Sequence, residues 1–540
     1  MKFPIGIQSF DQIITDGYAY VDKTDLVYSL ATEGKIYFLS RPRRFGKSLL
    51  LSTLENYFLG RRELFKGLKI DSLEKEWKTY PVFHIDFNGD PFTDGDRLKS
   101  TLEGYVAGWE AEYGVAPDIN LSHGRRFAKV LKAARERTGM RCVVLVDEYD
   151  KPMLDVMGLD ETVERNNTMV TLEDVNRETL KAFYSTFKLA DADLQFVLLT
   201  GVTKFSQLSV FSGFNQPKDI SMHPKYEAVC GITDSEIDSY LREPVGQMAE
   251  QAGCTYDEMR EMLRQQYDGY HFSGRMTGVY NPFCLLNALD SGALDNYWFR
   301  SGTPTYLVRL LKDCDERITD LVGKYYEQDE FEDYRADSQR PLPMIYQSGY
   351  LTIKGYDREM RTFRLDYPNE EVKKGLVTIL ANSFLGDKVN SKAIIRRLVE
   401  SLDRRNLKAF RDCFDSFLAG IPYSVRRKAD ERERERDFTY TLYLIFCLAS
   451  CYVTYVEKQQ SYGRLDCAIV TRDSAFVFEF KLDGKAEAAI AQIDEMGYTA
   501  EFRAPGRKVY KVGVSISSET GRIDDWKDVE EDLNIQPSGK

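Results

Sequence analysis

The fold follows from one short segment, Arg41-Pro42-Arg43-Arg44-Phe45-Gly46-Lys47-Ser48, which lies between the apolar run Ile36 to Leu39 and the helix-like run Leu49 to Leu59. A strand, a tight loop and a helix that begins with Lys and Ser direct backbone N–H groups and a helix dipole at a polyphosphate. Lys47 would then contact the β- and γ-phosphates, and Ser48 would ligate Mg²⁺. The segment departs from the usual motif, because an arginine stands where a glycine is expected.

A second segment supports a nucleotide site. The run Cys142 to Val146 is short, apolar and mostly β-branched, and it ends at Asp147-Glu148. A buried parallel strand is apolar along its whole length, and open α/β sheets bind ligands at the carboxyl ends of their strands. Asp147 is therefore predicted to hold Mg²⁺ through water, and Glu148 to polarise the attacking water. The alternative is a core strand that ends in a solvated acidic turn.

Two further apolar runs predict strands of the same sheet. The run Leu194 to Leu199 ends at Thr200-Gly201, which makes Thr200 a candidate sensor of the γ-phosphate. A threonine that closes a strand by capping a turn is the alternative. The run Pro81 to Asp86 contains His84, which we expect to be packed in the core rather than to bind a ligand.

Four stretches together resemble a known family: Tyr20 to Thr24, Arg41 to Ser48, Val143 to Asp150 and Thr200 to Ser206. They are similar to the bacterial AAA-ATPase-like proteins, which typically carry a C-terminal nuclease-like domain of the PD-(D/E)XK type. The resemblance covers the chain almost end to end, and the arginine-rich loop is that family's own variant of the phosphate loop. It implies ATP and Mg²⁺ as cofactors and a cofactor-binding segment made of Arg43, Arg44, Phe45, Gly46, Lys47 and Ser48. Arg43 or Arg44 would add positive charge near the phosphates, and a solvated loop arginine is the alternative.

Composition bounds the class of protein. The chain has 540 residues, of which 43% are hydrophobic, so two to four compact domains are expected. No segment is apolar enough to cross a membrane, and the first residues do not form a secretion signal. Nine cysteines without a Cys-x-x-Cys pair indicate reduced thiols in a cytoplasmic chain. The net charge of −12 argues against broad coating of nucleic acid, although clusters such as Arg426-Arg427-Lys428 leave room for a local basic face.

The expected fold class is α/β, with four parts along the chain. Residues 1–230 form an AAA-ATPase-like P-loop domain with a parallel sheet, in which Phe10 to Thr24 is a candidate to wrap the adenine. Residues 231–340 form a helical lid or subdomain, and its aromatic segment Tyr267 to Phe272 is expected to be core. Residues 341–428 are a connector, with strands predicted from Met344 to Asp366 and helices after them. Residues 429–540 form the restriction-endonuclease-like domain.

The second candidate site lies in a predicted hairpin. The strand Arg464 to Val470 carries Asp466, and the strand Phe476 to Lys481 carries Glu479 and Lys481 on one face. Two carboxylates can bind Mg²⁺, and an adjacent lysine can orient or deprotonate water for attack on a phosphodiester. The alternative is an edge hairpin with a cross-strand salt bridge.

The family resemblance supports a catalytic role for this hairpin over a structural one. Gln492 to Tyr498 would form the nuclease family's Gln-x-x-x-x-x-Tyr element on a helix, which makes Gln492 a further candidate. An acidic helix precedes the hairpin, and its Glu435 could add a metal ligand, although the neighbouring charges are typical of a solvated, salt-paired face.

The sequence thus predicts an ATP-driven module coupled to a Mg²⁺-dependent nuclease-like domain, with DNA as the expected substrate. A signalling or scaffold ATPase, whose nuclease-like domain only binds nucleic acid or protein, is the main alternative. A chain that binds ATP without turning it over is another. The sequence assigns no arginine finger, and a second copy in a homo-oligomer could supply one.

Overall fold

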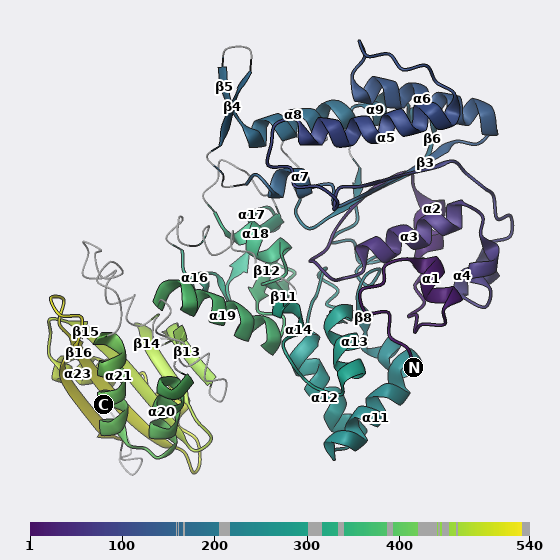
Figure 1. Cartoon of the computed structure of the whole chain (residues 1–540). Coiled ribbons are helices and arrows are strands. Elements are labelled where there is room, and N and C mark those ends of the chain that lie inside the picture. Colours follow the sequence, from purple (N-terminus) through teal and green to yellow (C-terminus); the bar gives the residue numbers. More distant parts are fainter. Residues whose placement is uncertain are drawn as a thin grey trace. The chain divides into compact units, whose positions relative to one another are not determined.

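The structure is a computed structural model, and it describes residues 1–157, 159, 161–165, 168–204, 217–300, 311, 316–332, 340–385, 392–419, 440, 443–444, 453–460 and 463–531. The chain divides into two compact units (Figure 1). Unit 1 comprises Met1–Glu316 and Leu321–Val372, and unit 2 comprises Arg317–Asp320 and Lys373–Lys540.

A five-stranded parallel sheet forms the centre of unit 1. Its strands lie in the order β2-β3-β6-β1-β7, with β1 Ile36–Ser40, β2 Val82–Asp86, β3 Cys142–Asp147, β6 Leu194–Gly201 and β7 Lys218–Asp219. All six residues of β3 are buried, as an apolar run in a parallel sheet requires. Because β6 lies between β1 and β3, Thr200 is brought between the phosphate loop and the acidic end of β3.

Helices cover both faces of this sheet (Figure 1). One face carries α1 Phe10–Thr15, α2 Thr24–Glu33, α3 Lys47–Phe58 and α4 Lys69–Leu73. The other carries α5 Arg97–Tyr113, α6 His123–Thr138, α8 Leu172–Tyr184 and α9 Thr186–Leu189. In the chain, η1 Arg62–Phe65 lies between α3 and α4, and η2 Asp191–Asp193 follows α9. The helix α7 Lys151–Leu154 and a hairpin of β4 Thr162–Arg165 and β5 Thr168–Thr171 lie between β3 and α8. This is the α/β arrangement expected from the sequence.

A helical part follows the sheet. It contains β8 Ile232–Thr233, α10 Asp234–Glu236, the π-helical turn η3 Ile237–Leu241, α11 Arg242–Ala252, α12 Tyr256–Tyr267, β9 Val279–Tyr280, α13 Pro282–Ser291 and α14 Tyr297–Arg300. Capping boxes begin α10 at Thr233 and α12 at Thr255, since each threonine is followed three residues later by a glutamate. Tyr267, Tyr270 and Phe272 are buried, as predicted for core aromatics.

Unit 1 closes with a second small sheet of β10 Tyr325–Tyr326, β12 Thr362–Asp366 and β11 Thr352–Asp357. The helices α17 Gln328–Glu332 and α18 Leu342–Gln347 lie between β10 and β11 in the chain. The prediction of strands from Met344 onward was therefore wrong at its start, because Met344 to Gln347 lie in α18 after two prolines that favour a first helical turn.

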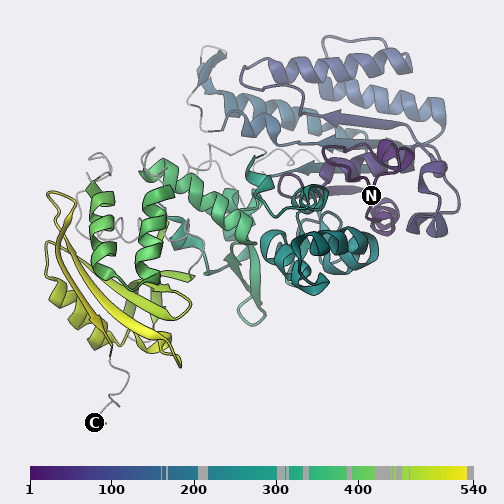
Figure 2. The same cartoon turned by 60° about the horizontal axis from the view of Figure 1, so that its bottom comes forward.

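Unit 2 contains a five-stranded sheet in the order β13-β14-β15-β16-β17. Its strands are β13 Val453–Gln460, β14 Gly463–Val470, β15 Ser474–Leu482, β16 Lys508–Ile516 and β17 Ile523–Glu530, and only the β15–β16 pair is parallel. The helices are α20 Lys392–Asp403, α21 Leu407–Ala419 and α23 Ala486–Met496, while α19 Glu370–Leu385 leads into the unit and η6 Ala500–Phe502 follows α23. Helices α21 and α23 lie on opposite faces of this sheet (Figure 2).

The two faces of β15 have different surroundings. Phe478 packs against Phe410 of α21, and Val477 shares a buried cluster with Ile490 and Ile493 of α23. Because side chains alternate along a strand, Glu479 and Lys481 lie on the same face as Val477. In the part of the chain that the structure describes, no helix is both long and apolar enough to cross a bilayer.

A pair of glycine variants tests the packing at the end of β6. A Cβ at Gly201 would lie 2.5 Å from Asp150 Oδ1 and 2.7 Å from the Tyr149 ring, whereas one at exposed Gly104 in α5 would meet no atom within 4 Å. We expect Gly201→Ala to lower the free energy of unfolding by about 1–3 kcal/mol. Gly104→Ala should raise it by about 0.5–1 kcal/mol, since alanine is the better helix former. Urea denaturation measures both, and a neutral Gly201→Ala would contradict the packing described.

Candidate functional site

The phosphate loop connects β1 to α3. Arg44 and Gly46 have positive φ angles of 70° and 91°, and Gly46 directly precedes the first residue of α3. No atom lies within 4 Å of the Cβ that Gly46 lacks, so the backbone borders open space there. The Lys47 side chain is 4% exposed, and its ammonium donates to the carbonyl oxygens of Arg41 at 3.2 Å and Pro42 at 3.5 Å. The loop therefore curves around a cation at a helix N-terminus, which is an arrangement that binds anions.

The acidic end of β3 faces this loop. Lys47 Nζ lies 3.6 Å from Glu148 Oε1. Thr200 donates from its hydroxyl to Asp147 Oδ1 at 2.7 Å, and the Glu148 backbone N–H donates to the same oxygen at 3.0 Å. The structure thus brings together Lys47, Asp147, Glu148 and Thr200, which the sequence predicted as one site.

Glu148 has an unusual backbone conformation. Its φ angle is 50°, in the left-handed region that non-glycine residues seldom adopt. Hydrogen bonds on both sides hold this conformation, since the Glu148 N–H bonds to Asp147 and the Tyr149 N–H donates to the Thr200 carbonyl at 3.0 Å. Strain of this kind is commonly found at functional sites, where the surrounding structure fixes a side chain in position.

Arg41 has a structural position beneath the loop. Its side chain is 1% exposed. Its guanidinium donates to the carbonyl oxygens of Ser40 at 2.9 Å, Ser221 at 2.8 Å and Tyr226 at 3.1 Å, and it lies 4.0 Å from the centre of the Phe272 ring. Burial lowers the pKa of this guanidinium. The arginine that replaces the expected glycine therefore joins the loop to the segment from Ser221 to Glu227.

The other loop residues differ in exposure. Arg43 and Arg44 are exposed, and the Arg44 guanidinium lies 4.9 Å from the centre of the Phe283 ring. Phe45 is buried and packs edge-on against Tyr270 and Phe272. The aromatic segment predicted to be core is thus the support on which the phosphate loop rests.

Two cavities adjoin the part of the loop from Phe45 to Ser48. An apolar cavity of about 280 Å³ is lined by residues that include Tyr20, Gly46 and Leu50, so it meets the loop where α3 begins. A polar cavity of about 350 Å³ contains Ser48 and Asp147 in its wall. A nucleotide and a magnesium ion fit this division, because the base would be buried in apolar surroundings and the ion would meet one hydroxyl and one carboxylate.

His84 also lines the polar cavity, and the prediction that it is a packed core residue was wrong. Its side chain is 30% exposed, and Nδ1 lies 3.0 Å from Glu55 Oε2. Along β2 the side chains alternate, so Phe83 and Ile85 are buried while His84 and Asp86 face the cavity.

Asp150 is a buried carboxylate that the sequence analysis did not single out. Its Oδ2 accepts hydrogen bonds from the Val202 N–H at 3.0 Å and from the Thr203 N–H and hydroxyl at 2.6 Å each. Burial, reinforced by the charge of Glu148, raises the pKa of Asp150 to about 6. The signal available in the sequence was its position three residues after Asp147, on the turn that leaves β3.

The second site lies on the hairpin of β14 and β15. Cys467 pairs with Phe478 at the end of the antiparallel register, and Asp466 and Glu479 are the residues next to this pair on the two strands. Asp466 Oδ2 accepts from the Phe480 N–H at 2.9 Å, and Lys481 Nζ lies 3.3 Å from Glu479 Oε1. The hairpin therefore brings the two carboxylates and the lysine together.

Helix α23 contributes to the same site. Gln492 Oε1 accepts a hydrogen bond from Lys481 Nζ at 2.7 Å, and the Gln492 side chain also bonds to Tyr498. Tyr498 lies beyond the helix, which ends at Met496 before Gly497 in the left-handed conformation. The expectation that the whole element lies on a helix was wrong in that detail, and Glu435 lies outside the described residues.

Metal binding at either site would depend on more than protein carboxylates. Among the described residues, no group of three or more His, Cys, Asp or Glu side chains is arranged to hold a metal ion. Mg²⁺ typically keeps several waters and takes one or two carboxylates together with phosphate oxygens. The pair Asp466 and Glu479, and the pair Ser48 and Asp147, fit that mode of binding.

Two family models match the chain. The model described as "Predicted AAA-ATPase" matches residues 4–211, and the model of the PD-(D/E)XK nuclease superfamily matches residues 433–526. The first match contains the phosphate loop and the acidic end of β3, and the second contains the hairpin with Asp466 and Glu479.

A relative is similar along nearly the whole chain. The "uncharacterized protein in vnfD 5'region" of Azotobacter chroococcum mcd 1 is 33% identical over 528 residues, which are 97% of this chain and 98% of the relative. Among solved structures, the Aeropyrum pernix ORC1 protein in complex with DNA is 12% identical with a TM-score of 0.23. CDC6P from Pyrobaculum aerophilum is 14% identical with a TM-score of 0.22, and each match covers 66% of this chain and 90% of the other. At such TM-scores neither likeness supports a conclusion.

The raised pKa of Asp150 predicts a pH effect on stability. A carboxyl group whose pKa is higher in the folded than in the unfolded state favours folding below its unfolded value, and this contribution is lost as the pH rises through the folded value. The ordinary pKa of an aspartate is 3.8, and that of Asp150 in the folded chain is about 6. Between these two pH values, deprotonation of Asp150 should therefore lower the free energy of unfolding as the pH rises. Asp150→Asn should remove this slope, while Asp16→Asn, on an exposed residue that follows α1, should keep it. Urea denaturation at pH 4.5, 5.5 and 6.5 measures the difference, and equal slopes in both variants would contradict the assignment.

Proposed function

Because this chain belongs to the bacterial family that joins an AAA-ATPase-like domain to a C-terminal domain of the PD-(D/E)XK nuclease superfamily, we propose that it hydrolyses ATP in unit 1 and cleaves DNA with Mg²⁺ in unit 2. The observation that carries the proposal for unit 1 is the 3.6 Å approach of Lys47 to Glu148 at the N-terminus of α3. For unit 2 it is the contact of Lys481 with both Glu479 and Gln492.

Each residue of the first site has a chemical role in this proposal. Lys47 would neutralise the β- and γ-phosphates, and Ser48 and Asp147 would hold Mg²⁺, which supplies charge stabilisation when it is bound. Glu148 lies next to the lysine and orients or deprotonates the attacking water. Thr200 donates to Asp147, which fixes the rotamer of that carboxylate. Arg43 and Arg44 are exposed at the loop, where they can approach the phosphates.

The second site has a similar division of roles. Asp466 and Glu479 would hold Mg²⁺, which polarises the scissile phosphate when it is bound. Lys481 orients or deprotonates the water that attacks phosphorus, and Gln492 holds the lysine by accepting its hydrogen bond. Gln492 acts through Lys481 and is therefore a positioning residue.

A second candidate function keeps the ATPase but assigns binding alone to the C-terminal unit. This unit would bind nucleic acid or protein, and the net charge of −12 favours protein as the partner, because DNA binding requires a local surplus of Lys and Arg. The intact set of Asp466, Glu479 and Lys481 favours cleavage. ATP turnover could also require a second copy of the chain, since an arginine finger is supplied by a neighbouring subunit in many ATPases.

Variants of the first site separate binding from hydrolysis. Lys47→Ala should lose ATP binding and turnover, because it removes the cation inside the loop. Glu148→Gln should bind ATP but hydrolyse it about 10²–10⁴-fold more slowly, since general base catalysis contributes that much. Lys75→Ala, on an exposed lysine, is the control. Phosphate release and fluorescent-nucleotide binding measure these effects, and turnover that survives Lys47→Ala excludes this site.

Variants of the second site test cleavage. The full chain is incubated with single- or double-stranded DNA and Mg²⁺ or Mn²⁺, with and without ATP. Lys481→Ala should abolish cleavage, and Gln492→Ala should reduce it and shift its pH profile, because the lysine loses its orienting partner. Lys527→Ala, on a half-exposed lysine of β17 that pairs with Glu487, is the control. Cleavage that persists in Lys481→Ala contradicts the assignment, and DNA binding without cleavage by the unmodified chain favours the binding-only alternative.

A further inference from the structure

The segment Tyr20 to Thr24 was singled out in the sequence, and the roles proposed above leave it unused. Asp22 and Thr24 both form hydrogen bonds with α4. Asp22 accepts hydrogen bonds from the backbone N–H groups of Thr24 at 2.9 Å and Lys69 at 2.8 Å, which joins the start of α2 to α4. Lys23 takes no part in that junction, and its side chain lines the apolar cavity beside the phosphate loop.

The apolar cavity is suited to a nucleobase. Its volume of about 280 Å³ is several times the roughly 30 Å³ share of one water in liquid. Its walls come from the N-terminal segment, α3, the strand β8 and the π-helical turn, and they include Val21, Leu50, Ile232 and Leu241. Gly46 belongs both to this wall and to the phosphate loop, so a nucleotide with its phosphates on the loop would have its base in the cavity.

Lys23 is the cationic side chain in the described wall of this cavity. Its side chain is 12% exposed, and Nζ lies 2.7 Å from Glu236 Oε2. Burial lowers the pKa of Lys23, and the neighbouring carboxylate of Glu236 opposes that effect. The charges of Lys47 and Lys23 both act on the thiol of Cys230, which lies in the same wall. An ammonium group has three N–H donors, so the bond to Glu236 leaves donors for a ligand.

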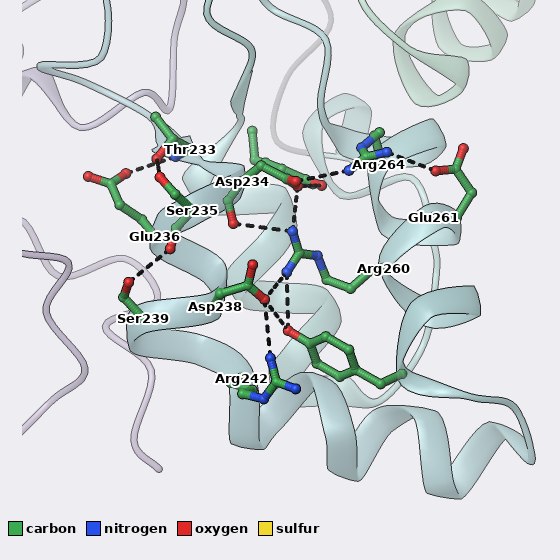
Figure 3. Close-up of polar contacts among 12 residues, drawn as sticks. Thr233, Asp234, Ser235, Glu236, Asp238, Ser239, Arg242, Arg260, Glu261 and Arg264 are labelled. Carbon is green, nitrogen blue, oxygen red and sulfur yellow. Dashed lines mark hydrogen bonds and ion pairs between the residues drawn. The ribbon is translucent and has the colours of Figure 1, made fainter.

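The helical part fixes the position of Glu236. On one side of α10 and η3, Arg260 forms ion pairs with Asp234, at 2.7 Å, and with Asp238 (Figure 3). Residues four apart lie on the same face of a helix, and a residue midway between them lies on the opposite face. Glu236 therefore points away from Arg260, and Tyr240, one turn further on, lines the cavity with Lys23.

Glu236 is held by a second contact as well. Its Oε2 accepts from the Thr233 backbone N–H at 2.8 Å, which closes the capping box of α10 (Figure 3). The carboxylate that pairs with Lys23 is thus fixed by the helix start, and the helix is fixed by Arg260. This arrangement holds a charged donor at the wall of an apolar cavity in one orientation.

We propose that Lys23, held by Glu236, selects the base of the bound nucleotide by donating a hydrogen bond to an acceptor atom of a purine. This inference rests on the proposed binding of nucleotide at the phosphate loop and goes beyond it, because it assigns base selection to the Tyr20 to Thr24 segment. A ring nitrogen of adenine and the carbonyl oxygen of guanine are both suitable acceptors. A buried donor favours a ligand that satisfies it and disfavours one that leaves it unpaired.

The test compares ligands with and without a base on the full chain. Dissociation constants are measured for ATP, GTP and inorganic tripolyphosphate, each with Mg²⁺, in the unmodified chain and in Lys23→Met. We expect Lys23→Met to weaken the preferred purine nucleotide about tenfold or more, as loss of a hydrogen bond to a charged group predicts. Tripolyphosphate binding should not change, and Lys23→Arg should restore part of the loss. Lys129→Met is the matched control, because its side chain is 50% exposed and pairs with Asp118.

A second variant keeps the proposal testable if Lys23→Met does not fold. Glu236→Gln retains the lysine but removes the charge that opposes its deprotonation. The affinity of this variant for the purine nucleotide should therefore decrease with rising pH, in a range where the affinity of the unmodified chain is constant. Glu261→Gln, on an exposed ion pair of α12, is its control.

The outcomes distinguish the inference from the proposed function. Base selection by Lys23 is wrong if Lys23→Met weakens the binding of ATP and of tripolyphosphate equally. It is also wrong if Lys23→Met leaves unchanged both the affinities and the preference between ATP and GTP. A Glu236→Gln profile that matches the unmodified chain would also overturn it. If the unmodified chain binds neither nucleotide in a manner that depends on Lys47, the proposed nucleotide site itself is wrong.

Discussion

The burial of the Arg41 guanidinium is the constraint on which the candidate nucleotide site depends. A buried cation is unfavourable unless it is hydrogen-bonded, and here backbone carbonyls of Ser40, Ser221 and Tyr226 accept hydrogen bonds from the two terminal nitrogens of the guanidinium while the Phe272 ring covers it. These contacts fix the end of β1, the segment before the helical part and the aromatic segment with respect to one another. The phosphate loop begins at this residue, so its course is set by a buried network rather than by a flexible glycine.

The same aromatic segment supports the loop from a second point. Phe45 packs against Tyr270 and Phe272, while Gly349 lies against Pro42 so closely that a Cβ there would approach its ring to 2.7 Å. Lys47 is held inside the curve that results, opposite Glu148. Contacts between residues far apart in the sequence thus fix Lys47 and Glu148, the two side chains that the proposed hydrolysis needs.

Much of the fold and of both sites was predictable because short motifs specify local geometry. The apolar run that ends in Asp147-Glu148 predicted β3, and the alternation around Glu479 predicted its shared face with Lys481. The role of Arg41 was not predictable, since its partners Ser221, Tyr226 and Phe272 come from distant segments. His84 was mistaken for a core residue because an apolar run does not reveal that one face of β2 borders a polar cavity. The start of the predicted strand at Met344 failed because the two preceding prolines favour a helical turn.

The two sites have a common arrangement, in which a carboxylate holds a lysine and a helix positions it. Lys47 lies at the start of α3 opposite Glu148, and Lys481 lies between Glu479 and Gln492 of α23. In each case the proposed function has a phosphate contact the lysine and Mg²⁺ bind at the nearby carboxylates. The family relationship links an ATPase-like domain to a nuclease-like one, which is consistent with two phosphate-directed sites in one chain.

Hydrogen–deuterium exchange of the full chain, with and without Mg²⁺ and ATP, tests the central claim most directly. We expect slower exchange in peptides that span residues 41–50, 142–150 and 229–241, because the loop, the end of β3 and the cavity wall would close around one nucleotide. Lys47→Ala should abolish that protection. Saturating ATP that leaves these three segments unchanged, while it protects residues elsewhere, would contradict the account.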